Sequence, residues 1–129
     1  MISELITFLE ANTSSFTTID HAWDTEPVDQ VREIIPALFV FPGEDNTESD
    51  GTDYLVSKML HSDINIYIVC LNTELEALKT ELRATVLGWN AGAAYTDTEL
   101  VSGKPISLKG GIVWWHEVYR NARNIRASY

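Results

Sequence analysis

Apolar and polar residues follow two periodic patterns along the chain, and the first of them is the pattern of an amphipathic helix. Near the start, four apolar side chains recur every three or four residues and predict a short amphipathic helix over residues 2–12. The same spacing recurs later and predicts a longer helix over residues 73–89. Thr73 and Glu76 have the spacing of a capping box, which predicts Thr73 as the N-cap of this second helix.

The second pattern is typical of β-strands, with β-branched and aromatic side chains that alternate with polar residues or follow one another directly. Five segments of this kind predict strands: residues 16–23, 34–41, 64–71, 106–108 and 112–119. Both faces of the 64–71 segment are largely apolar, so we expect this strand at the centre of the sheet. Lys109-Gly110-Gly111 predicts a tight hairpin, and Gly103-Lys104-Pro105 predicts a turn.

The order of these elements is α-β-β-β-α-β-β, and it predicts the fold class. We expect an α+β fold with a single, mostly antiparallel (mixed) β-sheet and two helices packed on one face. Residues 1–129 are expected to form a single domain, because no linker divides them. Residues 43–53 contain five acids and no hydrophobic residue, and predict an acidic flexible loop. Residues 112–129 predict a terminal strand followed by a basic tail.

Composition adds an uneven distribution of charge to this picture. The chain has a net charge of −10, which argues against a dedicated nucleic-acid binder. Its 45% hydrophobic residues indicate a globular protein. Residues 1–57 carry 12 acidic side chains and one basic side chain, Arg32, whereas residues 58–129 are nearly neutral. One interpretation is a solvated acidic loop that aids solubility, and the other is two faces that meet different partners.

Side chains that could carry chemistry are few. The single Cys70 excludes an intramolecular disulfide and lies in the most hydrophobic predicted strand, where a thiol acts as a small apolar group. Three groups of histidines and carboxylates are candidate metal ligands: His21 with Asp20 and Asp24, His61 with Asp63, and His116 with Glu117. Each histidine is also an ordinary surface residue in this composition, and the sequence favours that interpretation. We therefore expect no catalytic residue, no cofactor and no metal, and no apolar run is long enough to span a membrane.

The C-terminal segment is the strongest candidate for an interaction surface. In a strand, Trp114 and Trp115 must point to opposite faces, so one can enter the core while the other remains available to a partner. Two alternatives are a strand buried on both sides and a solvated basic tail. The interface hypothesis predicts a head-to-tail contact between this basic segment and the acidic half of another copy. The candidate interface residues are Trp114, Trp115, Tyr119, Arg120, Arg123 and Arg126.

The layout as a whole resembles the tail terminator, or minor tail (head-tail joining), proteins of long-tailed bacteriophages. The resemblance covers most of the chain as a pattern and begins with the short N-terminal helix. It continues through three segments: residues 37–42 (ALFVFP), 64–89 (INIYIVCLNTELEALKTELRATVLGW) and 110–119 (GGIVWWHEVY). A basic and aliphatic tail ending at Arg126 follows them.

This resemblance implies a structural virion protein and not an enzyme. Such proteins assemble as a ring, usually a hexamer, at the head-proximal end of the tail tube, where they stop tube polymerisation and join the tail to the neck. The implied partners are further copies of the chain, the tail tube protein and a neck or head-tail connector protein. DNA passes through the ring without specific binding. The implied locations are the virion tail and, during assembly, the host cytoplasm.

Acidic walls suit such a channel, because like charge discourages adhesion to phosphates. The acidic residues expected to face the lumen or a partner are Glu44, Asp45, Glu48, Asp50 and Asp53.

Other functions remain open from the sequence. Within the structural class, the chain could be another head-tail connector or a tail-tube component. A monomeric acidic binding module that mimics DNA would use the carboxylates of residues 20–53. A small metal-dependent or acid–base enzyme would need one of the histidine groups to converge in a cleft.

Overall fold

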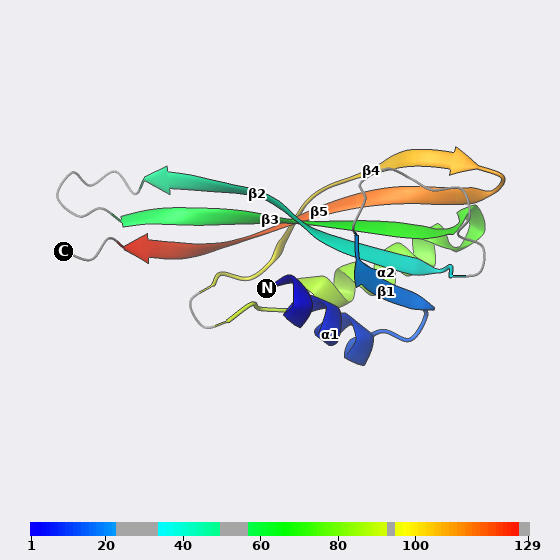
Figure 1. Ribbon diagram of the computed structural model, residues 1–129, viewed down its shortest axis with the longest axis horizontal. Helices are drawn as coiled ribbons and strands as arrows, with labels where there is room; N and C mark the ends of the chain where they lie inside the picture. Colours follow the sequence, from blue (N-terminus) through cyan, green and yellow to red (C-terminus); the bar gives the residue numbers. More distant parts are fainter. Residues whose placement is uncertain (23–33, 50–56, 93–94, 127–129) are drawn as a thin grey trace.

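A five-stranded sheet organises the described part of the chain, and the two helices found there pack against one of its faces (Figure 1). The computed structural model describes residues 1–22, 34–49, 57–92 and 95–126. The elements are α1 (Ile2–Asn12), β1 (Thr18–His21), β2 (Ala37–Ser49), β3 (Ser57–Leu71), a 3-10 turn (Asn72–Glu74), α2 (Leu75–Leu87), β4 (Glu99–Lys109) and β5 (Ile112–Arg126). This order confirms the predicted α+β class. Within the described ranges, no helix is long and apolar enough to cross a membrane.

The strand order across the sheet is β1-β2-β3-β5-β4, which makes the sheet mixed. β1 runs parallel to β2, and all other neighbouring pairs are antiparallel. β3 lies at the centre, as the two apolar faces of residues 64–71 predict, and Ile66 and Tyr67 are buried on opposite sides of it. β4 forms one edge of the sheet, and the four-residue β1 forms part of the other.

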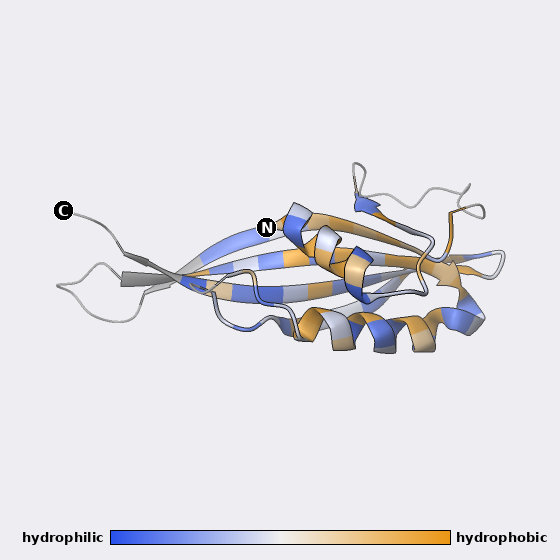
Figure 2. Ribbon diagram, turned by 90° about the horizontal axis from the view of Figure 1, so that it is seen from below, coloured by the Kyte–Doolittle hydropathy of each residue, from blue (hydrophilic) through white to orange (hydrophobic). Residues whose placement is uncertain are grey.

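The face of the sheet under the helices holds the larger core. β3 contributes four fully buried residues, Ile64, Ile66, Ile68 and Cys70. The helices cover them with Leu5, Leu9, Leu82 and Val86, whose spacing of three or four residues produces one apolar side on each helix (Figure 2). Burial raises the pKa of the Cys70 thiol to about 11, so this side chain behaves as the apolar core residue that the sequence predicts.

The opposite face carries an aromatic cluster. Trp114 and Tyr67 are buried there, with an edge-on ring contact of 5.8 Å between centroids. Phe39 stacks on Trp114, and Phe41 packs against Tyr67. Residues 34–35 pack against this cluster, and no helix in the described part of the chain covers it.

The structure confirms the predicted hairpin and contradicts the predicted capping box. Gly110 and Gly111 form the tight β4–β5 hairpin with φ values of 58° and 79°, a left-handed conformation that glycine adopts without strain. The predicted capping box is wrong. The chain leaves β3 directly into the 3-10 turn, so Thr73 lies inside that turn, and α2 begins after Glu74 with no side-chain cap.

The sheet is also longer than the sequence indicates. The predicted turn at Gly103-Lys104-Pro105 is wrong, because β4 runs through it as an edge strand, where proline and bulges are tolerated. β2 continues through Ser49, so residues 43–49 of the predicted acidic loop lie in a strand, and 50–53 lie outside the described residues. Residues 120–126 of the predicted tail are the last part of β5.

Candidate subunit interface

Three strands extend together beyond the helices and form what we call the arm: residues 43–49 of β2, 57–63 of β3 and 120–126 of β5 (Figure 1). After a bulge between Pro42 and Asp45, β2 pairs with β3 again, with Asn46 opposite His61, and His61 lies opposite Ala122 of β5. β3 is the middle strand of the arm, because it pairs with both β2 and β5. The arm therefore has two outer edges, one on β2 and one on β5.

The β2 edge of the arm is acidic. β1 pairs with β2 only as far as Val40, so no described strand covers the outer side of β2 beyond that residue. Glu44 and Asp45 are exposed there, and Glu48 lies farther along the same strand. We call Glu44, Asp45 and Glu48 the acidic edge. Asp50 and Asp53, the other two predicted residues of this group, lie outside the described residues.

The β5 edge of the arm is basic. Arg120, Arg123 and Arg126 lie along β5, and we call them the basic edge. β4 begins opposite Arg120, and beyond it the segment before β4 lies along β5 as far as Arg123. There a single bridge joins Tyr95 to Arg123, and the Arg123 guanidinium lies 5.6 Å from the centroid of the Tyr95 ring. Arg123 remains exposed.

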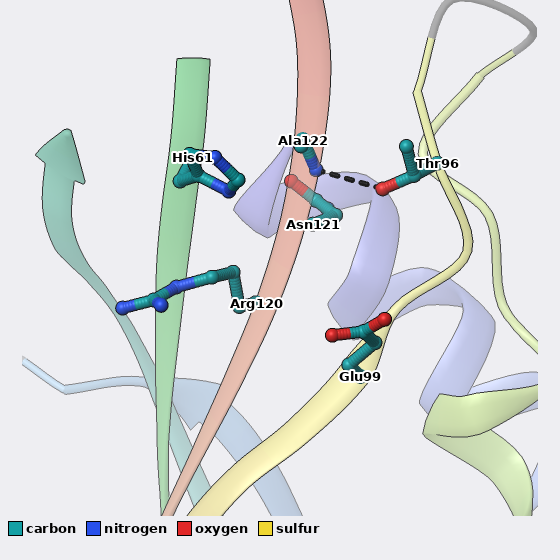
Figure 3. A pocket seen from close by; sticks show the side chains of 6 residues that line it. All are labelled: His61, Thr96, Glu99, Arg120, Asn121 and Ala122. Carbon is teal, nitrogen blue, oxygen red and sulfur yellow. Dashed lines mark hydrogen bonds between the residues drawn. The ribbon is translucent and has the colours of Figure 1, made fainter. Parts of the chain in front are cut away.

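Arg120 differs from its neighbours because it is bound within its own subunit. Its Nε donates to Asp63 Oδ1 at 2.7 Å and its Nη2 donates to Asp63 Oδ2 at 3.3 Å. These bonds and the charge of Asp63 raise the pKa of the Arg120 guanidinium, so it stays charged. Figure 3 shows its side chain reaching across β3, away from Glu99. The charge of Arg120 is thus partly neutralised, and Arg123 is the better probe of the basic edge.

A hollow of about 280 Å³ lies where the arm joins the rest of the sheet (Figure 3). It is lined by His61, Thr96, Glu99, Arg120, Asn121 and Ala122. The Ala122 backbone N–H donates to Thr96 Oγ1 at 2.9 Å, and the Thr96 N–H donates to the Ala122 carbonyl. These bonds hold the segment before β4 against β5, so the hollow is a fixed part of the β5 side of the sheet.

The three aromatic candidates lie deeper than the arginines. Trp114 and Trp115 point to opposite faces, as predicted. Trp114 belongs to the buried aromatic cluster, and Trp115 lies under α2, where Lys79 Nζ is 4.2 Å from its ring centroid. Tyr119 is fully buried in the core beneath the helices. Participation of these three side chains in a subunit contact stays a prediction.

Comparison with known protein families explains why a subunit interface is expected at all. The model of the phage tail terminator protein family matches residues 2–128, nearly the whole chain. The chain belongs to this family. No individual curated protein gives a match beside it. The family places the chain among the structural proteins of the phage tail, so the predicted resemblance is confirmed.

In this tail terminator protein the three histidine groups do not form a metal site among the described residues. His116 and Glu117 point to opposite faces of the sheet, and Asp63 is held by Arg120. Asp20 accepts a hydrogen bond from the His21 backbone N–H, and Asp24 lies outside the described residues.

Glu117 has a structural role that its place in the sequence does not suggest. Its carboxylate is completely buried and accepts from Arg83 Nε at 2.8 Å and Arg83 Nη2 at 2.9 Å. It also accepts from Trp115 Nε1 at 3.0 Å and from the Tyr119 hydroxyl at 3.2 Å. The pKa of Tyr119 is raised, first by burial and then by the neighbouring Glu117 charge, so the hydroxyl remains a donor. This network ties α2 to β5.

Proposed function

We propose that this tail terminator protein forms a closed ring at the head-proximal end of the tail tube, where it stops tube polymerisation and joins the tail to the neck. In this proposal, the basic edge of one copy meets the acidic edge of the next. The observation that carries it is the placement of Arg123 and Asp45 on opposite edges of one arm.

Within one copy the two edges interact only at the base of the arm, where the charge of Glu44 is the last and smallest cause of the raised pKa of Arg120. β3 separates β2 from β5, and two strand spacings place the edges about 10 Å apart. The β2 edge also presents backbone groups to which a further strand can add, whereas the β5 edge is paired with the segment before β4 at Ala122 and Arg123. A contact between two different edges is heterologous and closes into a ring when the rotation permits. The family resemblance favours a hexamer.

The same arrangement suits the passage of DNA. Residues 1–57 hold most of the acidic side chains, and among these Glu44 and Asp45 are exposed. Carboxylates of this half that lie outside the contact between copies can line the channel, where they repel phosphates and keep the DNA from binding. The partners in this proposal are further copies of the chain, the tail tube protein and the neck or head-tail connector protein.

The test uses two charge reversals that should cancel in a mixture. Arg123→Glu makes the basic edge repel the neighbour's acidic edge, and Asp45→Lys does the same from the other side. We expect each variant alone to lose ring formation, measured by sedimentation velocity in the presence of tail tubes. A mixture of the two variants restores complementary contacts in alternating order and should form rings again.

The matched control is Glu10→Lys, which makes the same charge change as Asp45→Lys at an exposed position on α1. It should assemble like the wild type. Wild-type assembly by Arg123→Glu alone would contradict the edge-to-edge contact. Electron microscopy of the wild type with tail tubes should show rings at tube ends. Long filaments would indicate a tube component, and a 1:1 complex with a basic partner would indicate an acidic binding module.

A further inference from the structure

β4 is an edge strand with exposed side chains along nearly its whole length. It pairs only with β5, and no described strand lies on its other side. Ten of its eleven residues are exposed, and only Ser107 is partly covered. An edge of this length is a surface that a protein must either protect or use.

The exposed side chains of β4 are unusually apolar. Leu100, Val101, Ile106 and Leu108 are exposed by 36%, 46%, 40% and 60%. They are four of the six large hydrophobic side chains that are exposed in the described part of the chain. Single exposed hydrophobic residues are ordinary, but a concentration of them on one strand marks an interaction site.

The backbone of β4 cannot pair with a long, regular partner strand. The register with β5 skips Val101 and Ile106, which marks two bulges, and Pro105 has no N–H to donate. A partner strand could follow this edge only for a few residues at a time. The affinity of this surface must therefore come mainly from its apolar and charged side chains.

The charges on β4 point to an acidic partner. Lys104 and Lys109 lie on the strand with one acid, Glu99, in a chain whose net charge is −10. Across the sheet, the acidic edge places the exposed Glu44 and Asp45 beside the exposed Pro42. A second copy of the chain thus offers two exposed carboxylates next to an apolar residue, which complement the two lysines and the apolar side chains of β4.

We propose that β4 is the apolar centre of the contact between copies and that its occupant is the acidic edge of β2 in a second copy. This inference rests on the proposed ring. β4 continues the basic edge of the arm along the same side of the sheet, and β2 lies on the opposite side. One copy can therefore use both surfaces at once, with β4 toward one neighbour and β2 toward the other. The apolar side chains at the centre of this contact are those of Leu100 and Val101, because they are the exposed apolar residues of β4 nearest to Arg123.

The direct test places a photo-cross-linker in the full-length protein as Val101→p-benzoylphenylalanine. A mixture of ¹⁴N- and ¹⁵N-labelled copies is assembled on tail tubes and irradiated, and the cross-linked peptides are identified by mass spectrometry. We expect peptides that join residue 101 to residues 41–49 of a differently labelled copy. Cross-links to the tube protein alone, to another part of the second copy, or within one copy would overturn the proposal.

A second measurement uses the double variant Leu100→Ser/Val101→Ser. It should weaken self-association about tenfold or more and leave circular dichroism unchanged, because both side chains are exposed in the subunit. The matched control is Leu87→Ser on α2, which removes a leucine exposed by 45% and should have no effect. Normal rings from the double variant would contradict the role of β4 while the proposed function stands. A wild type that forms no ring even on tail tubes would contradict both.

Discussion

Two neighbouring residues of β5, Glu117 and His116, lie on opposite faces of the sheet and differ in burial and in the charge that their surroundings favour. Glu117 points toward the helices, is completely buried and is surrounded by donors from Arg83, Trp115 and Tyr119. His116 points to the aromatic face, is only partly buried, and its Nε2 lies 2.6 Å from Asn65 Oδ1. This fold therefore keeps a charge on its most buried face by satisfying it completely. On the more open face it places a ring that favours the neutral form.

Removing the buried carboxylate should have the largest effect on stability. Glu117→Ala leaves the Trp115 and Tyr119 donors without their acceptor and breaks the pair with Arg83. We expect the free energy of unfolding to fall by about 3–5 kcal/mol, as measured by urea denaturation. The control is Glu76→Ala, which removes an exposed carboxylate that pairs with Lys79 and should change stability by less than about 1 kcal/mol. Equal losses in both variants would end the distinction between buried and exposed charge.

Crowding the same network from the edge strand should have an intermediate effect. A Cβ at Gly103 would overlap Glu117 Oε2 and lie 3.0 Å from Trp115 Nε1. Gly103→Ala should therefore destabilise the protein by about 1–3 kcal/mol in the same denaturation experiment. At Gly88 the nearest atoms to a Cβ lie 3.6 Å away, so Gly88→Ala should stay within about 0.5 kcal/mol. A neutral Gly103→Ala variant would show that the network can move aside and is less rigid than its hydrogen bonds indicate.

The elements that could be predicted from the sequence are those whose signal is local. The two helices, the central strand and the Gly110-Gly111 hairpin each follow from spacing or turn chemistry within a few residues. The opposite orientation of Trp114 and Trp115 follows from the alternation of any strand. These features require no knowledge of what packs against them.

The features that could not be predicted depend on partners distant in the sequence. Glu117 is buried because Arg83, 34 residues earlier, reaches it from α2. Gly103 lies in a strand because β5 supplies the pairing, although its neighbours Lys104 and Pro105 are typical of a turn. The charged segments at 43–49 and 120–126 resemble loops, and they are strands because both pair with β3. For the candidate interface, the sequence supplied the charges, whereas their placement on opposite edges required the sheet order.

The smallest expected effect is a pH dependence that arises from the aromatic face. Burial, followed by the nearby charge of Lys104, lowers the pKa of His116, and Glu117 opposes this from the other face. The unfolded chain therefore binds a proton at His116 before the folded protein does, so this residue's contribution to stability is complete above the unfolded pKa of about 6.5. This contribution declines as the pH falls from about 6.5 toward the folded pKa.

An NMR titration should give a His116 midpoint below about 6.5, and Lys104→Gln should raise it. His116→Phe should remove this part of the change in urea midpoint between about pH 7.5 and 5.5. A His116 midpoint at or above the unfolded value would mean that both faces of the sheet tolerate charge equally, and the contrast between Glu117 and His116 would then fail.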